Sequence, residues 1–186
     1  MFNETIQRLA SALEKQNIPY MIIGGQAVLL HGEPRLTRDI DITLGIDIQE
    51  YESVRQIVDF LGLKALVDSP KQFINETRVL PLLDPKTDIR IDMIFSFSDF
   101  ERQAVKRSIS VETNGYMVKY TTAEDLVIHK MFAGRPRDLE DVKGILLKNT
   151  NLNMTYIDDW LEQFDLILEK NLKSKLRVIL NSIQKK

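Results

Sequence analysis

Residues 20–44 read YMIIGGQAVLLHGEPRLTRDIDITL and combine an apolar run, a pair of glycines and an acidic segment that alternates with apolar residues. The apolar run at 20–23 is typical of a short buried strand, and the residues after the glycines predict a helix start over 26–31. A strand that leads through Gly24 and Gly25 into a helix presents backbone N–H groups with no side chains in front of them. Such groups at a helix N-terminus suit a phosphate ligand, so the glycine pair is a candidate phosphate contact.

Three acidic residues occur in two segments whose side chains alternate as on strands. Residues 39–44 read Asp-Ile-Asp-Ile-Thr-Leu, so a strand here places Asp39 and Asp41 on the face opposite the isoleucines. Residues 89–94 repeat the pattern and place Asp92 on a polar face. Two carboxylates therefore stand two residues apart on one strand, and a third stands on another.

This acidic set has the chemistry of a site for a hard divalent cation. Mg²⁺ prefers oxygen ligands and commonly binds through a few carboxylates together with substrate phosphates. Two such ions, about 3.5–4 Å apart, can activate an attacking oxygen and stabilise a leaving pyrophosphate. The alternative is that Asp39 and Asp41 are two solvated acids on an amphipathic strand. The glycine pair upstream and Asp92 downstream favour a site for Mg²⁺ or Mn²⁺, with two ions expected.

The order of these residues resembles the DNA polymerase beta-like nucleotidyltransferase superfamily. The resemblance rests on the glycine pair, the Asp-x-Asp of the first alternating segment and the later Asp92. The local sequence is similar to the AbiEii/AbiGii-toxin-like branch, in which Arg-x-Thr-x-Asp-x-Asp is a common form and which residues 35–41 match. Together with a second block described below, the resemblance extends over residues 18–147.

The resemblance implies a role for each residue of the first block. Asp39 and Asp41 would be catalytic metal ligands, and Asp92 would be the third carboxylate and would activate the acceptor hydroxyl. Gly24 and Gly25 would contact the phosphates of the nucleotide. Many superfamily members have Gly-Ser at this point, so the second glycine of this chain leaves only backbone donors there.

The second block is residues 125–142, DLVIHKMFAGRPRDLEDV. In the toxin-like branch the Lys of this block is associated with the nucleotide, which implies a catalytic and nucleotide-binding role for Lys130 and a nucleotide-site role for Asp138 and Asp141. The alternative is an ion pair between Lys130 and one of these acids, worth about 0–1 kcal/mol if exposed. Asp138 and Asp141 share a helix face, so they could equally hold Lys130 or Arg135 in place.

Two arginines flank the acidic pair and are candidates for phosphate contact. Arg38 adjoins Asp39, and neighbouring side chains on a strand point to opposite faces. Arg35 is therefore the better candidate for a bidentate phosphate contact. The alternative is that both arginines only balance the carboxylates.

Composition restricts the class of protein. The 186 residues carry 25 Lys and Arg against 27 Asp and Glu, so the net charge of −2 gives no bulk basic field for nucleic acid. The absence of cysteine excludes a disulfide framework, a thiol nucleophile and a zinc–thiolate site. The N-terminus lacks a basic region followed by an apolar one, and no apolar run approaches a membrane span. We expect a cytoplasmic enzyme without a membrane partner.

The patterning predicts an α/β (α+β) fold in two parts. We expect helices over 3–16, 48–61 and 98–107, strands over 72–83 and 88–95, and a hairpin over 109–120 that turns at Asn114-Gly115. Residues 1–120 would form the nucleotidyltransferase-like mixed β-sheet with flanking helices. Residues 121–186 read as entirely helical and would form a C-terminal helical region that completes the cleft.

The expected activity is transfer of a nucleoside monophosphate from an NTP to an acceptor hydroxyl. Some members of the toxin-like branch modify tRNA ends, so the resemblance implies a tRNA or RNA acceptor, a toxin–antitoxin system and an antitoxin protein as partner. The basic residues available for RNA are few and lie late in the chain: Lys143, Lys148, Lys170, Lys173, Lys175 and Arg177. The alternatives are a small-molecule transferase of the aminoglycoside-modifying kind and a non-catalytic nucleotide-binding module.

Overall fold

The computed structural model describes residues 2–184, and over them the chain forms two compact units. Of the described residues, unit 1 holds 2–26 and 36–121, and unit 2 holds 27–35 and 122–184. The division falls within helix α2 (Gly24–His31), whose first turn belongs to unit 1. Unit 1 therefore contains the glycine pair and the alternating acidic segments.

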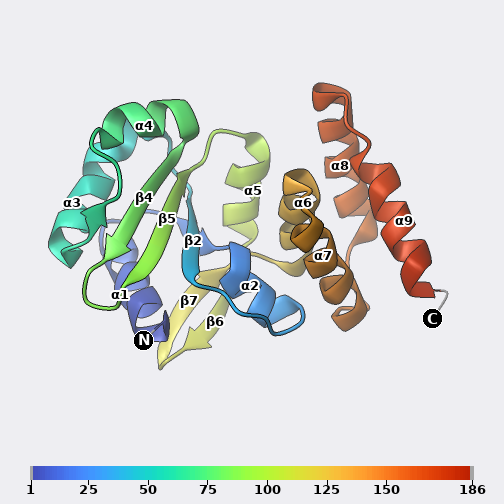
Figure 1. The fold of residues 1–186 in the computed structure, drawn as a ribbon, viewed down its shortest axis with the longest axis horizontal. Coiled ribbons are helices and arrows are strands. Elements are labelled where there is room, and N and C mark those ends of the chain that lie inside the picture. The colour runs from blue at the N-terminus through green and yellow to red at the C-terminus, as the bar shows by residue number, and fades with distance from the viewer. Residues whose placement is uncertain (1, 185–186) are drawn as a thin grey trace. The chain divides into compact units, whose positions relative to one another are not determined.

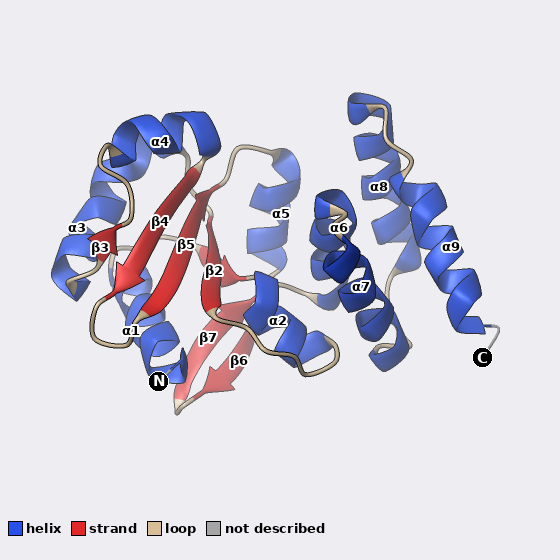
Figure 2. Ribbon diagram, viewed as in Figure 1, coloured by secondary structure: helices blue, strands red, loops and turns tan. Residues whose placement is uncertain are grey.

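Unit 1 is built on a mixed sheet, seven-stranded over the described residues, in the order β3-β4-β5-β2-β1-β7-β6 (Figures 1 and 2). The strands are β1 (Tyr20–Ile22), β2 (Asp39–Leu44), β3 (Lys64–Ala65), β4 (Val79–Asp84), β5 (Ile89–Phe95), β6 (Ile109–Thr113) and β7 (Tyr116–Tyr120). Strand β2 runs parallel to β5 and antiparallel to β1. The mixed sheet with flanking helices confirms the predicted fold class, and β6 and β7 confirm the predicted hairpin.

Alternating burial fixes the faces of the central strands. The apolar residues of β2 and β5 are buried on one face: Ile40, Ile42, Leu44, Ile89, Ile91, Met93 and Phe95. A period of two along a strand sends the residues between them to the other face. A register shift of one residue would exchange the two faces and expose the whole apolar set. The core therefore determines where the acidic residues of these strands point.

The helices that begin in unit 1 are α1 (Phe2–Lys15), α2, the short 3₁₀ segment η1 (Ile48–Glu50), α3 (Tyr51–Leu61), α4 (Pro70–Thr77) and α5 (Asp99–Arg107). Helix α1 buries Ile6, Leu9 and Leu13, which lie three or four residues apart on one face. Gly62 ends α3 in a left-handed conformation, with φ of +69°. The helices predicted over 3–16, 48–61 and 98–107 are thereby confirmed.

The strand predicted over 72–83 is wrong in its first half. Residues 70–77 form helix α4, and strand β4 begins only at Val79. Pro70 stands in the first turn of α4, where its fixed φ favours a helix and its missing N–H costs nothing. Arg78 then ends the helix in a left-handed conformation with φ of +63°. The two large apolar residues of α4, Phe73 and Ile74, are adjacent in the sequence, so the segment shows no apolar repeat at helical spacing.

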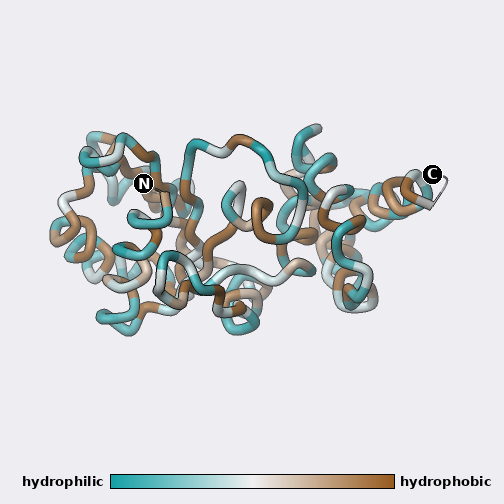
Figure 3. Tube along the Cα trace, turned by 90° about the horizontal axis from the view of Figure 1, so that it is seen from below, coloured by the Kyte–Doolittle hydropathy of each residue, from teal (hydrophilic) through white to brown (hydrophobic). Residues whose placement is uncertain are grey.

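Unit 2 consists of the rest of α2 and four further helices within the described residues: α6 (Ala123–Ala133), α7 (Pro136–Lys148), α8 (Met154–Leu168) and α9 (Leu172–Gln184). Figure 3 shows hydrophobic and hydrophilic residues alternating along the C-terminal helix, as expected of a helix with one apolar face. At the end of α7, the Lys148 ammonium donates to the carbonyl oxygens of Leu30 and Gly32 at 3.3 and 3.2 Å. The prediction of an entirely helical C-terminal region is confirmed.

Within residues 2–184 no helix is both long enough and apolar enough to cross a membrane.

Candidate active site

The three acidic residues predicted as metal ligands come together on one face of β2 and β5. In the parallel register Asp41 stands opposite Asp92, and Asp39 stands opposite Arg90. Paired strands lie about 4.8 Å apart, so Asp41 and Asp92 are direct neighbours across the ladder. All three acids are partly exposed, while the residues that alternate with them are buried. The predicted placement of these carboxylates on the polar face is therefore confirmed.

The backbone of Gly24 lies against the carboxylate of Asp41. A Cβ atom on residue 24 would lie 1.8 Å from Oδ2 of Asp41 and 2.7 Å from its Cγ, so the Asp41 carboxylate would have to move to admit it. The backbone of Gly24 also has φ of +59°, a conformation that residues with a Cβ seldom adopt. The β1–α2 turn thus brings its backbone against an acidic side chain of the site. A phosphate contact by Gly24 stays a prediction.

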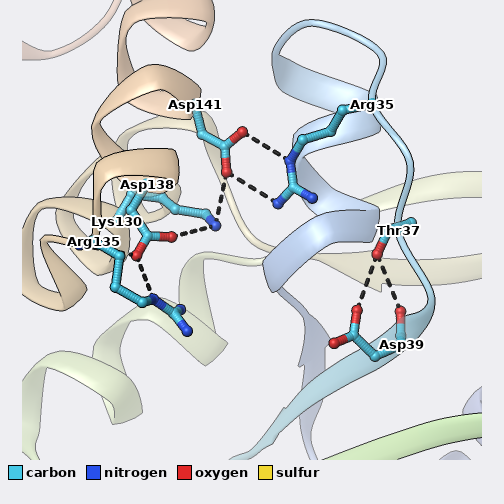
Figure 4. A network of polar contacts seen from close by, with 7 residues as sticks. All are labelled: Arg35, Thr37, Asp39, Lys130, Arg135, Asp138 and Asp141. Carbon is cyan, nitrogen blue, oxygen red and sulfur yellow. Dashed lines mark hydrogen bonds and ion pairs between the residues drawn. The ribbon is translucent and has the colours of Figure 1, made fainter.

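Gly25 is matched in the same way to Thr37. A Cβ atom on residue 25 would lie 2.2 Å from Oγ1 of Thr37 and 2.8 Å from its Cβ. The Thr37 hydroxyl in turn donates to Oδ1 of Asp39 at 3.1 Å (Figure 4). Gly24 therefore leaves room for a side chain of β2, and Gly25 leaves room for a side chain of the segment that leads into β2. Thr37 is part of the Arg-x-Thr-x-Asp-x-Asp form, but the sequence pattern alone indicates no role for it.

Arg90 is the second residue of the site that sequence reasoning missed. Its guanidinium binds the carboxylate of Asp92 with both donors, Nε to Oδ1 at 3.1 Å and Nη2 to Oδ2 at 3.2 Å. The hydrogen bonds and charge of Asp92 raise the pKa of Arg90, and the nearby charges of Asp39 and Asp41 add to the effect. The available signal was the Arg-x-Asp spacing, because residues two apart on a strand share a face.

The donor set fits a hard divalent cation, although the side chains do not now converge on one. Among the described residues, no group of three His, Cys, Asp or Glu side chains is gathered closely enough to hold a metal ion. Thr37 engages Asp39, and Arg90 engages Asp92. Carboxylate oxygens from Asp39, Asp41 and Asp92 are nevertheless the ligands that Mg²⁺ and Mn²⁺ take. These three residues would hold the ion once Arg90 has left Asp92.

Arg90→Gln is expected to strengthen metal binding by the nucleotide-free protein. The substitution removes a cation that competes for Asp92 and leaves the three carboxylates in place. The Arg90 side chain is 56 % exposed, so losing the ion pair should lower the free energy of unfolding by only about 0–1 kcal/mol. Thermal unfolding with and without Mn²⁺ measures the effect, because a ligand that binds only the folded state raises its melting temperature.

Arg55→Gln is the matched control for that prediction. Arg55 forms exposed ion pairs with Glu52 and Asp59 on α3, away from the three carboxylates. The Mn²⁺-induced rise in melting temperature should be larger in Arg90→Gln than in the wild type and unchanged in Arg55→Gln. Equal rises in all three proteins would show that Arg90 does not compete with the metal.

The second block of predicted residues forms an ion-pair cluster in unit 2 (Figure 4). Lys130 is buried, and its ammonium lies 2.8 Å from Oδ1 of Asp138 and 2.9 Å from Oδ2 of Asp141. Arg35 binds Asp141 through Nε at 2.8 Å and Nη2 at 3.0 Å, and Arg135 binds Asp138 at 2.7 Å. The ion pairs that the sequence analysis offered as the alternative for Lys130 are thus present.

Burial and nearby positive charges have opposite effects on the pKa of Asp138 in this cluster. Burial alone would raise the pKa of Asp138, but hydrogen bonds from Lys130 and Arg135, and their positive charges, outweigh it and lower that pKa. Breaking one partner of a buried pair leaves an uncompensated charge and is strongly destabilising. Arg35 and Lys130 are both held by carboxylates here, so a phosphate contact by either would require it to leave an existing partner.

The sequence matches one family of nucleotidyltransferases. Residues 1–182 match the model of a family described as nucleotidyltransferase of unknown function (DUF6036). The AbiEii/AbiGii-toxin-like branch is a finer assignment than this match gives, and it stays a prediction. No curated protein shows a significant match to the chain.

Several solved structures are similar in fold. The solution structure of the antibiotic-resistance factor ANT(2'')-Ia has a TM-score of 0.59 and 16% identity, covering 98% of this chain and 95% of that one. A crystal structure of ANT(2'')-Ia in complex with adenylyl-2''-tobramycin has a TM-score of 0.57 and 17% identity, with 87% and 95% covered. A nucleotidyltransferase-like protein from Paracoccidioides brasiliensis has a TM-score of 0.57 and 18% identity, with 94% and 91% covered. At these identities the similarity shows the fold, which is nucleotidyltransferase-like as predicted.

Proposed function

The chain belongs to the family of nucleotidyltransferases of unknown function (DUF6036), and on that premise we propose that it transfers a nucleoside monophosphate from an NTP to a small hydroxylated molecule. The observation that carries this proposal is the set of three carboxylates on one face of β2 and β5, with Gly24 shaped to admit one of them.

In this proposal two of the carboxylates act on the nucleotide and the third acts on the acceptor. Asp39 and Asp41, from one strand, would hold the cations that accompany the triphosphate, and Asp92 would serve the acceptor side. A bound divalent cation, Mg²⁺ or Mn²⁺, supplies charge neutralisation for the phosphates and lowers the barrier to attack. Arg90 must release Asp92 first, which frees its guanidinium to contact a phosphate oxygen.

The reaction is a single displacement at phosphorus. The oxygen of the acceptor hydroxyl forms a bond to the α-phosphorus, and the bond from that phosphorus to the bridging oxygen of the leaving pyrophosphate breaks. Asp92 accepts the proton of the hydroxyl. Backbone N–H groups in the first turn of α2, from Gly24 and Gly25 onward, lack intrahelical partners and would face the phosphates. Positioning and charge neutralisation carry most of the catalysis of such transfers.

The cluster in unit 2 supports a positioning role for its members. Each of Lys130, Asp138 and Asp141 has charged partners within hydrogen-bonding distance. Asp141 also fixes Arg35, which precedes Thr37 of the acidic segment by two residues. In this proposal the cluster fixes Arg35 within unit 2, and direct contact of Lys130 or Arg35 with the nucleotide is the alternative.

Two observations support a small acceptor over RNA. One structure with a similar fold, ANT(2'')-Ia, is described in complex with adenylyl-2''-tobramycin. Two of the cations considered for RNA contact are already paired with acids of α8: the Lys173 ammonium lies 2.8 Å from Glu162, and Arg177 pairs with Asp158. The net charge of −2 also gives the chain no bulk basic field to attract a nucleic acid.

Incubation with each α-labelled NTP, Mg²⁺ and either a panel of aminoglycosides or total RNA tests the proposal. We expect label in the small-molecule fraction. Label in RNA alone would replace the small acceptor by the RNA predicted from the toxin-like resemblance and would leave the nucleotidyltransferase activity standing. Binding of NTP without label in any fraction would instead indicate a nucleotide-binding module.

A further inference from the structure

Residues 25 and 37 compete for one side-chain volume beside the acidic face of unit 1. The Cβ position of residue 25 lies 2.2 Å from the Thr37 hydroxyl oxygen, and contacts under 3.0 Å essentially never occur for real Cβ atoms. Gly25 is buried, and the three atoms nearest to that Cβ position all belong to Thr37. Only one of the two positions can carry a side chain without displacement of the other.

The side chain that occupies this volume reaches a proposed metal ligand. Thr37 Oγ1 donates to Asp39 Oδ1 at 3.1 Å, while the backbone carbonyl of Asp39 lies at 3.5 Å and is the weaker acceptor (Figure 4). A hydrogen bond to one carboxylate oxygen limits rotation of the Asp39 side chain and leaves its second oxygen for a ligand. Outer partners of this kind orient metal-ligating carboxylates, and their loss typically lowers metal affinity about 10- to 100-fold.

We propose that Thr37 is a positioning residue for Asp39 and that residue 25 is glycine because Thr37 fills its side-chain volume. This inference rests on the proposed function, because it assigns Asp39 a metal to hold. It differs from a phosphate-contact role for Gly25, which requires only an uncovered backbone N–H. It also predicts that the effects of substitutions at 25 and 37 depend on each other.

The first test separates the hydroxyl of Thr37 from its bulk. Thr37→Val removes the hydroxyl and keeps the shape, whereas Thr37→Ser keeps the hydroxyl and loses a methyl group. Binding of Mn²⁺ to the nucleotide-free protein should weaken about tenfold or more in Thr37→Val and stay within about threefold of the wild type in Thr37→Ser. Thr77→Val is the control, because the Thr77 hydroxyl bonds the Phe73 carbonyl on α4 and reaches no carboxylate.

The second test asks whether the effect of Gly25→Ala depends on the side chain at position 37. Gly25→Ala should weaken Mn²⁺ binding and lower the melting temperature, because the new methyl group collides with Thr37. In a Thr37→Gly background the same Gly25→Ala change should cost little in melting temperature, since the volume is then empty. Costs that simply add would mean that the two residues do not share the volume.

The outcomes distinguish this inference from the proposed function. A wild-type protein that neither binds Mn²⁺ nor transfers label overturns the proposed function, and the positioning role of Thr37 falls with it. If the wild-type protein binds Mn²⁺ and Thr37→Val binds it equally tightly, the positioning role of Thr37 is overturned and the proposed function stands. If Gly25→Ala fails to fold, the Thr37→Val and Thr37→Ser pair still decides the role of the hydroxyl.

Discussion

Asp41→Asn is expected to reduce nucleotidyl transfer by about a hundredfold or more, the order of loss that follows removal of one electrostatic stabiliser from an active site. The variant keeps the shape of the side chain and removes one negative charge from a cluster that also holds Asp39 and Asp92. Relief of like-charge repulsion should hold or raise the melting temperature of the metal-free protein. Steady-state transfer and thermal unfolding of the same preparation measure both effects.

Asp92→Asn separates the acceptor side from the nucleotide side. It should abolish transfer but leave binding of a non-hydrolysable NTP with Mg²⁺ within about tenfold of the wild type. Asp59→Asn, an exposed acid paired with Arg55 on α3, is the control and should change neither quantity. If Asp41→Asn transferred the nucleotide at the wild-type rate, the carboxylates would have no catalytic role. Equal loss of NTP binding in Asp41→Asn and Asp92→Asn would place both acids with the triphosphate.

Gly24→Ala should be as damaging to transfer as the loss of a carboxylate. The added methyl group would lie 1.8 Å from Oδ2 of Asp41, so the carboxylate must move or the turn must open. The left-handed backbone at φ of +59° adds strain of about 1–2 kcal/mol for a residue with a Cβ. We expect a lower melting temperature together with loss of Mn²⁺ binding and transfer.

Gly62→Ala controls for backbone strain without the collision. Gly62 has φ of +69°, and a Cβ there would meet no atom within 4 Å. Its substitution should lower the melting temperature through backbone strain alone, by less than Gly24→Ala, and leave Mn²⁺ binding and transfer intact. If Gly24→Ala matched Gly62→Ala in transfer, the close approach of the turn to Asp41 would have no functional meaning.

The parts of the fold and site that the sequence predicted are those set by local alternation. The period of two over 39–44 and 89–94 was enough to place Asp39, Asp41 and Asp92 on the polar faces of their strands. Helix α4 was missed, because it is short and its two large apolar residues, Phe73 and Ile74, are adjacent and do not recur at helical spacing. The two-residue strand β3 is too short to give any pattern.

The partners within the site depend on contacts that a linear pattern does not contain. Thr37 meets Gly25 through space across the β1–α2 turn, and the sequence offers only two small residues twelve positions apart. Arg35 and Asp141 are 106 residues apart in the chain, so their bidentate pair could not be read from spacing. The pairing of Lys130 with Asp138 was foreseen as an alternative, because an acid at the start of the next helix suggests it.

The stoichiometry of label from a doubly labelled NTP tests the central claim most directly. The wild-type protein, Mg²⁺ and the acceptor fraction that accepts label would be supplied with an NTP labelled at both the α- and the γ-phosphorus. We expect the α-label on the acceptor in an amount equal to the γ-label released as pyrophosphate. With Asp41→Asn, both amounts should fall by about a hundredfold or more. Transfer of the γ-label to the acceptor, or its release as orthophosphate, would contradict nucleotidyl transfer by this site.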